Sequence, residues 1–157
     1  MSSIALGRIS GNAVNTSFIH YKWSASGNQS IAASTQTALL ASNFSVAKQT
    51  GSNILVGCFT GSTFTAPVTG TYTITWYGRM NNPSSSALME YWLIVTGSFS
   101  SQLSHMGGPN IFCAPLCWKG NLTQNDQVSF IGFSTVATAF TGANTGDHTI
   151  SIDLQGA

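Results

Sequence analysis

The stretch from residue 64 to residue 80 reads Phe-Thr-Ala-Pro-Val-Thr-Gly-Thr-Tyr-Thr-Ile-Thr-Trp-Tyr-Gly-Arg-Met, and it decides the fold class. Pro67 cannot donate a backbone hydrogen bond, so it belongs at the edge or corner of a strand. After the glycine the pattern alternates with period two, which puts Tyr72, Ile74 and Trp76 on one face of a predicted strand. β-Branched and aromatic residues dominate this segment. We therefore expect the other strands to pack around these three side chains.

Charged residues are rare in this chain of 157 residues. Only 6% are Asp, Glu, Lys or Arg, against about 25% in ordinary domains, whereas Ser and Thr make up roughly a quarter. The five cations are scattered and form no basic stripe, which argues against nucleic acid as a partner. The length suits one domain. A surface of hydroxyls and amides suits packing against copies of the same chain.

The sequence also predicts where the protein is made. It contains no recognisable secretory signal and no run long enough for a transmembrane span, so we expect synthesis in a cytoplasm and no membrane insertion. Cys58, Cys113 and Cys117 are odd in number and do not form a disulfide framework. A protein made in this way can still reach the outside of a cell as part of a virus particle released by lysis.

Short strands separated by turns account for most of the remaining sequence. Strands are predicted over residues 18–24, 88–95, 111–119, 127–134 and 148–154. Pro115 is expected to break the third of these, residues 97–108 have a mixed pattern, and residues 31–40 suit either a helical turn or short strand pieces. Many short strands without an amphipathic helix predict an all-β, two-sheet antiparallel sandwich.

Three motifs resemble those of one superfamily. The pattern Phe-x-Ala-Pro-x-x-Gly-x-Tyr-x-Ile within residues 64–74 resembles the signature of the complement globular-head (C-one-q) and tumour necrosis factor superfamily. Residues 122–128 resemble its leucine, turn, aspartate and valine segment; Asn125 stands where a glycine is usual, and asparagine tolerates the left-handed backbone. Residues 149–154 resemble its closing strand, without the usual Phe-Ser-Gly opening. In register over residues 18–157, the motifs imply a trimeric jelly roll of about ten strands that binds ligands and is not an enzyme.

The histidines and cysteines are poorly spaced for a metal site. His20, His105 and His148 are far apart in the sequence, and no second Cys or His pair follows Cys113 and Cys117. We therefore expect reduced structural thiols, no metal and no cofactor.

The acidic residues point to structural roles. A nucleophilic triad using His148 fails because the adjacent Asp147 points to the opposite face of a strand. Glu90 lies in an apolar strand and is expected to pair with a cation such as Arg79 across the sheet. Asp126 is expected to fix its turn through backbone amides.

The resemblance is strongest to the viral members of the superfamily, which are phage or virus capsid spikes, fibres and receptor-binding heads. It implies a non-enzymatic protein on the virion surface that attaches to a host as a homotrimer. Two alternatives stay open: a purely structural capsid or decoration protein, and an extracellular complement-head-like recognition module. The second lacks the collagen-like Gly-x-x repeat that would favour it. We divide the chain into an N-terminal arm or tether (1–17), which would contact other virion proteins, and a jelly-roll head (18–157).

Polar loops are the expected recognition sites, because a rigid sandwich can vary its loops without losing its core. The longest are residues 81–86, 104–110 and 137–146, whose amides, hydroxyls and one aromatic ring suit a host surface receptor such as a neutral glycan. The candidate ligand-binding residues are Asn81, Asn82, Ser85, His105, Asn110, Phe140 and Asn144. The candidate trimer-interface residues, from strands with excess apolar surface, are Tyr77, Tyr91 and Leu93.

Overall fold

The computed structural model describes residues 16–81, 87–96, 98–106, 112–141 and 148–156, and the side chains of residues 98–106 and 112–114 lie outside this description. Regular structure in these ranges is β-strand apart from two 3₁₀ helices, η1 (Ala41–Asn43) and η2 (Asn53–Leu55). The strands of seven residues or more are β1 (Thr16–Trp23), β4 (Phe44–Gly51), β7 (Gly70–Met80), β8 (Leu88–Val95), β9 (Ser98–Met106), β10 (Phe112–Leu122), β11 (Gln127–Ser134) and β13 (Thr149–Gln155). The shorter strands are β2 (Gln29–Ile31), β3 (Thr37–Ala38), β5 (Phe59–Thr60), β6 (Thr63–Thr65) and β12 (Thr138–Phe140).

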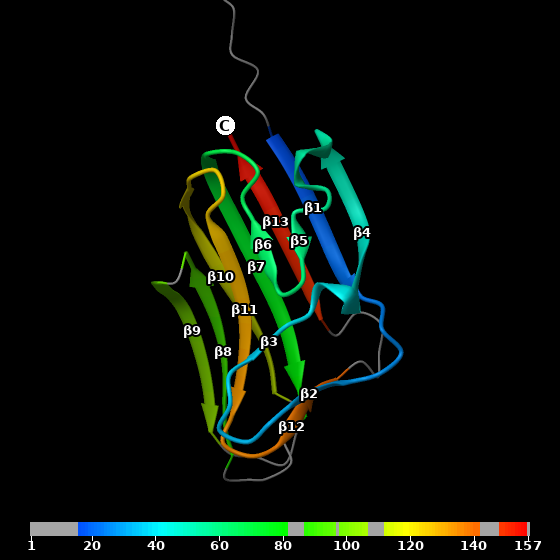
Figure 1. Cartoon of the computed structure of the whole chain (residues 1–157), viewed down its shortest axis with the longest axis vertical. Coiled ribbons are helices and arrows are strands. Elements are labelled where there is room, and N and C mark those ends of the chain that lie inside the picture. The colour runs from blue at the N-terminus through cyan, green and yellow to red at the C-terminus, as the bar shows by residue number, and fades with distance from the viewer. Residues whose placement is uncertain (1–15, 82–86, 97, 107–111, 142–147, 157) are drawn as a thin grey trace, which may run out of the picture.

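The strands form two antiparallel sheets packed face to face (Figure 1). The first sheet has the order β2-β12-β7-β13-β1-β4, in which β12 and β13 pair with different parts of one edge of β7. Strand β10 pairs with the opposite edge of β7. The second has the order β5-β6-β11-β8-β9, and β3 also pairs with β11. This arrangement confirms the predicted two-sheet jelly roll.

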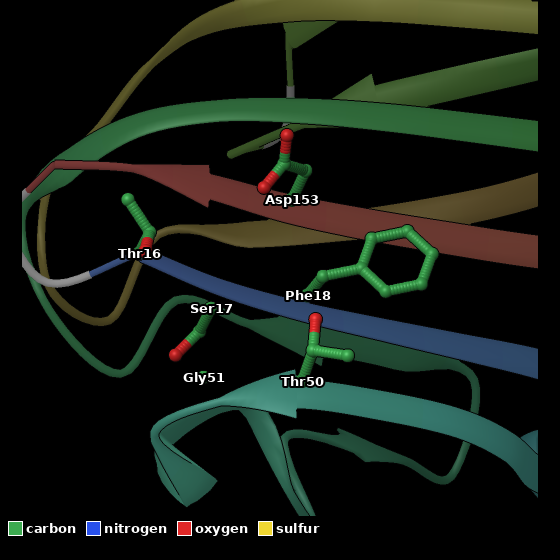
Figure 2. A pocket seen from close by; sticks show the side chains of 6 residues that line it. All are labelled: Thr16, Ser17, Phe18, Thr50, Gly51 and Asp153. Carbon is green, nitrogen blue, oxygen red and sulfur yellow. The ribbon is translucent and has the colours of Figure 1, made fainter.

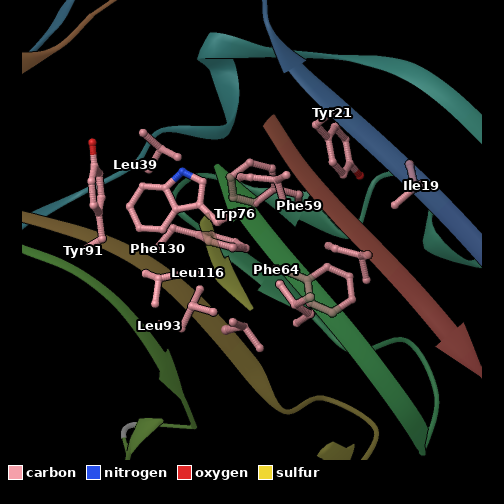
Figure 3. Packing of buried hydrophobic residues seen from close by; sticks show 14 of the residues in the cluster. Ile19, Tyr21, Leu39, Phe59, Phe64, Trp76, Tyr91, Leu93, Leu116 and Phe130 are labelled. Carbon is pink, nitrogen blue, oxygen red and sulfur yellow. The ribbon is translucent and has the colours of Figure 1, made fainter. Parts of the chain in front are cut away.

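Strand β7 lies at the centre of the first sheet, and its inward side chains organise the core. Tyr72, Ile74 and Trp76 are each at most 1% exposed, as the alternation of the sequence predicts. The Trp76 ring meets the ring of Tyr91 edge-on at 4.9 Å and that of Phe130 at 5.7 Å. Edge-to-face aromatic pairs of this kind stabilise a core beyond their buried area. Figure 3 shows these rings between the two sheets.

The neighbouring strands complete the core with the same period of two. The inward residues of β1, β11 and β13 are nearly all fully buried: Ile19, Tyr21, Trp23, Val128, Phe130, Ile150, Ile152 and Leu154. The buried residues of these three strands therefore follow the same alternation as those of β7.

The turn between β10 and β11 has the predicted chemistry. The Thr123 amide donates to Asp126 Oδ2 at 2.8 Å, and the Asp126 amide donates to the Thr123 carbonyl at 2.9 Å. Asn125 has φ of +74°, so it occupies the left-handed conformation in which glycine is usual.

Several segments differ from the sequence prediction, and one decides between the alternatives that the sequence left open. Residues 98–106 form β9 despite their mixed pattern, because the backbone of β8 supplies their hydrogen-bond partners. Pro115 does not break β10: among the described strands β10 pairs only with β7, so its outer edge needs no N–H from a proline. Residues 31–40 contain short strand pieces and no helix, and β1 begins at Thr16, two residues before the predicted head.

Candidate interaction surfaces

The register of the strands brings the flanks of the three predicted recognition loops to one end of the sandwich. Met80, where β7 ends, is opposite both Phe112 at the start of β10 and Phe140 in β12. Leu88 at the start of β8 is opposite Met106 at the end of β9. We call this the loop end, seen at the bottom of Figure 1. Strand β1 begins at the opposite end, so the described residues that follow the predicted arm and those that flank the predicted loops lie at opposite ends of the domain.

Two of the seven ligand candidates can be placed with their side chains. Asn81 is exposed at the loop end. Its backbone N–H donates to the Ala139 carbonyl at 3.2 Å, and its backbone carbonyl accepts a hydrogen bond from the Thr138 hydroxyl. Phe140, in contrast, is fully buried. The backbone of His105 lies in β9, opposite Met89. Outside the described residues lie the His105 side chain and the whole of Asn82, Ser85, Asn110 and Asn144.

The prediction that Phe140 is an exposed recognition residue is therefore wrong. Its ring lies 5.7 Å from that of His148, 6.1 Å from that of Trp76 and 6.4 Å from that of Tyr91. Gly132 on β11 leaves the room for it, because a Cβ there would lie 2.3 Å from Phe140 Cζ. The small residues around Phe140 indicated a loop, but pairing of β12 with β2 and β7 turns this ring into the core.

His148 joins three strands beneath the loop end and is fully buried. Its ring lies 4.8 Å from that of Trp23, and Nδ1 accepts a hydrogen bond of 3.3 Å from the Arg79 amide. Its carbonyl accepts from the Trp23 amide at 2.9 Å. Asp153 is five residues along the strand, about 16 Å away at 3.3 Å per residue, so it cannot orient this imidazole for catalysis. The contacts of His148 are those of a structural residue.

Strand β8 has one inward and one outward apolar face, and the named interface candidates lie on the inward one. Tyr91 and Leu93 are 1% and 0% exposed within the sandwich, so the prediction that they contact another subunit is wrong. The outward face carries Trp92 and Ile94, which are half-buried. The Trp92 ring stacks on Phe133 of β11 at 5.9 Å and 12°. Simple alternation identified two faces but could not tell which one pointed to the core.

The third interface candidate, Tyr77, is on the outward face of the first sheet. Its side chain is 37% exposed, and it is one of four large apolar residues that are exposed among the described residues. Its same-face neighbours along β7 are Thr73, Thr75 and Arg79. The outward aromatic groups of the two sheets therefore lie on opposite faces of the sandwich.

The described cysteines and acidic groups form no metal centre. Cys58 and Cys117 are free thiols, and no three His, Cys, Asp or Glu side chains come together within the described ranges. Burial raises the pKa of the Cys58 thiol, and its Sγ donates to the Ile54 carbonyl at 3.3 Å. Burial, with a smaller effect of Cys58, raises the pKa of Tyr21 to about 12.

Across the same ranges no helix has the length and apolar character needed to span a membrane.

Comparisons with known proteins support the fold. No protein-family model and no curated protein sequence matches the chain. The structure resembles murine APRIL at pH 5.0, with 12% identity and a TM-score of 0.64 over 88% of this chain and 98% of that one. It resembles Eiger TNF from S. frugiperda, with 10% identity and a TM-score of 0.58 over 87% and 90%. It also resembles the PRD1 vertex protein P5, with 16% identity and a TM-score of 0.59 over 90% and 73%. The chain thus has the tumour necrosis factor-like jelly-roll fold that the sequence motifs predicted.

Proposed function

We propose that this protein is a non-enzymatic virion surface protein whose homotrimeric head attaches the particle to a host. The observation that carries the proposal is the likeness of the fold to a phage vertex protein, combined with a charge content of only 6%. The start of β1 and the strand ends that flank the loops lie at opposite ends of the sandwich. This separation suits an arm (1–17) that joins other virion proteins and loops that contact a host.

The proposed trimer uses the two outward aromatic groups. Tyr77 lies on one face of the sandwich, and the Trp92–Phe133 pair lies on the other. Contact between two different surfaces of neighbouring copies is heterologous and forms a closed ring when the rotation permits. Aromatic residues are enriched at protein–protein interfaces.

Light scattering on the purified chain tests the trimer directly. We expect a mass three times that of the chain at micromolar concentration. Tyr77→Glu should shift the population to monomer, because it places a charge in the interface. The matched control Ser45→Glu, on the exposed strand β4, should stay trimeric. A monomeric wild-type protein would refute the assembly.

Attachment is tested with the intact trimer and host cells. In each of the three predicted loops the residues between the strands (82–86, 107–110 and 142–146) are replaced by Gly-Ser residues. The residues that belong to β9 and β12 are retained, among them Phe140, which is part of the core. We expect the wild-type trimer to bind cells and block infection, and at least one replacement to abolish both effects. Three weak contacts on one axis would reinforce one another through effective concentration. If the wild-type trimer neither binds nor competes, the attachment role fails.

A purely structural capsid or decoration role is the second candidate. The burial of Phe140 favours it, because this removes the one aromatic ring that the sequence offered for recognition at the loop end. This role predicts a trimer that binds particles lacking it, through residues 1–17, and does not bind host cells.

A further inference from the structure

The strongest unassigned feature is a small hollow at the end opposite the loops. It has a volume of about 210 Å³ and is lined by Thr16, Ser17, Phe18, Thr50, Gly51 and Asp153. The strand register puts Phe18 of β1 directly between Asp153 of β13 and Thr50 of β4. Figure 2 shows these side chains around the hollow. Side chains opposite one another on adjacent strands are close enough to contact one ligand.

Backbone contacts hold the floor of the hollow in place. Gly51 has φ of +81°, and a Cβ there would lie 2.2 Å from the Thr16 carbonyl oxygen, so β4 approaches β1 closely at this point. Ser17 points the other way, is 2% exposed, and its hydroxyl donates to the Ser52 carbonyl at 2.9 Å. The hollow is therefore built into the sheet, and it does not depend on a loop.

The groups that face the hollow combine one ring with several oxygens. Phe18 is half-buried and its ring lies parallel to that of His20, at 6.4 Å and 8°. His20 is held in turn by a hydrogen bond of 2.8 Å between Nδ1 and Ser151 Oγ. Asp153 Oδ2 accepts a hydrogen bond of 3.0 Å from Nε2 of the Gln155 side chain, which orients the carboxylate. Its other oxygen has capacity to accept hydrogen bonds from a ligand.

This chemistry selects one class of ligand. The carboxylate, and the absence of a cation among the described residues that line the hollow, disfavour phosphate, sulfate and acidic sugars. The single aromatic ring of Phe18 offers too little apolar surface to bind a wholly apolar ligand. A neutral sugar ring has an apolar C–H face for Phe18 and hydroxyls for Asp153, Thr16 and Thr50; hydrogen bonds to a carboxylate are among the strong ones. Sites for drug-sized ligands span about 300–1,000 Å³, so this smaller hollow suits one ring.

We propose that this hollow binds a single neutral pyranose unit, stacked on Phe18 and hydrogen-bonded by Asp153. The hollow lies at the end away from the loops, so it does not depend on the attachment role. It shares the outward face of the first sheet with Tyr77, because Asp153 is opposite Thr73 on β7. We expect a Kd on the order of millimolar, because a ligand of one ring has few non-hydrogen atoms to contribute binding energy. A free glycoside and the terminal sugar of a glycan chain share this chemistry.

The test is saturation-transfer NMR on the full chain with the methyl glycosides of glucose, galactose, mannose and N-acetylglucosamine. At least one should bind, and Asp153→Asn and Phe18→Leu should each weaken binding about tenfold. Thr50→Val should weaken it less. Thr149→Val, on the same face of β13 but outside the hollow, is the matched control and should leave binding unchanged. Circular dichroism and melting temperature establish that each variant is folded.

The outcomes separate cleanly. Absence of binding by all four glycosides at millimolar concentration overturns the proposal, as does binding that the variants of the hollow leave unchanged. Stronger binding of sialic acid or inorganic phosphate than of every neutral glycoside also overturns it. Comparison of the soluble glycoside with the same sugar at the end of an immobilised oligosaccharide then identifies the natural source. Host-cell binding by the trimer is measured separately, so failure of one proposal leaves the other standing.

Discussion

The contact between Gly132 and Phe140 gives the sharpest test of how the core closes beneath the loop end. In Gly132→Ala the new Cβ would lie 2.3 Å from Phe140 Cζ and 2.7 Å from Cε1. The ring cannot retreat easily, because Trp76, Tyr91 and His148 surround it. Overpacking a closed core costs about 1–3 kcal/mol, and we expect a loss of that size in the free energy of unfolding.

A double-mutant cycle identifies the cause of this loss. Phe140→Ala alone should cost about 3–5 kcal/mol, as for other fully buried phenylalanines. With the ring gone, Gly132→Ala should cost almost nothing, since its methyl group then enters vacated space. The coupling energy between the two sites should therefore be about 1–3 kcal/mol. Urea unfolding at one fixed protein concentration measures all four free energies, because association would otherwise shift the midpoint.

Gly27→Ala is the matched control. A Cβ at Gly27 would meet no atom within 4 Å, and the residue is exposed. Its effect should stay within about 0.5 kcal/mol. If Gly132→Ala is as harmless as this control, or if Phe140→Ala costs less than about 0.5 kcal/mol, then Phe140 is not in the core and the reasoning fails.

Four further substitutions test other parts of the sandwich. Trp76→Ala should cost about 3–5 kcal/mol in urea unfolding, because it empties the centre of the core; a loss below 1 kcal/mol would contradict that position. The Tyr21 hydroxyl is buried and has no hydrogen-bond partner in the part of the chain that the structure describes, so Tyr21→Phe should stabilise the protein by up to about 1 kcal/mol. Burial raises the pKa of Tyr21 from 10.0 to about 12, so between these values the unfolded chain loses a proton that the folded protein keeps. The free energy of unfolding of the wild type should therefore fall as the pH rises from 10 through about 12, and this fall should be smaller in Tyr21→Phe. Asp126→Ala should cost about 1 kcal/mol through the lost bond to the Thr123 amide, whereas Asn125→Gly should be neutral or slightly stabilising at its positive φ.

The amino-acid sequence by itself determined the fold class, the central strand and much of the core. Alternation is a local property, and in β7 only one phase of it buries the large side chains, so Tyr72, Ile74 and Trp76 could be assigned inward in advance. Turn chemistry is equally local, which is why Asn125 and Asp126 have the conformation and the hydrogen bond expected of them.

The tertiary structure alone decided the questions that depend on partners distant in the sequence. Strand β8 is apolar on both faces, so only its pairing with β11 shows that Tyr91 points inward and Trp92 outward. Phe140 lies among small residues, and its burial depends on the space left by Gly132 on another strand. The hollow beside Phe18 is likewise invisible in the sequence. Its residues come from β1, β4 and β13, and only the register of the sheet brings them together.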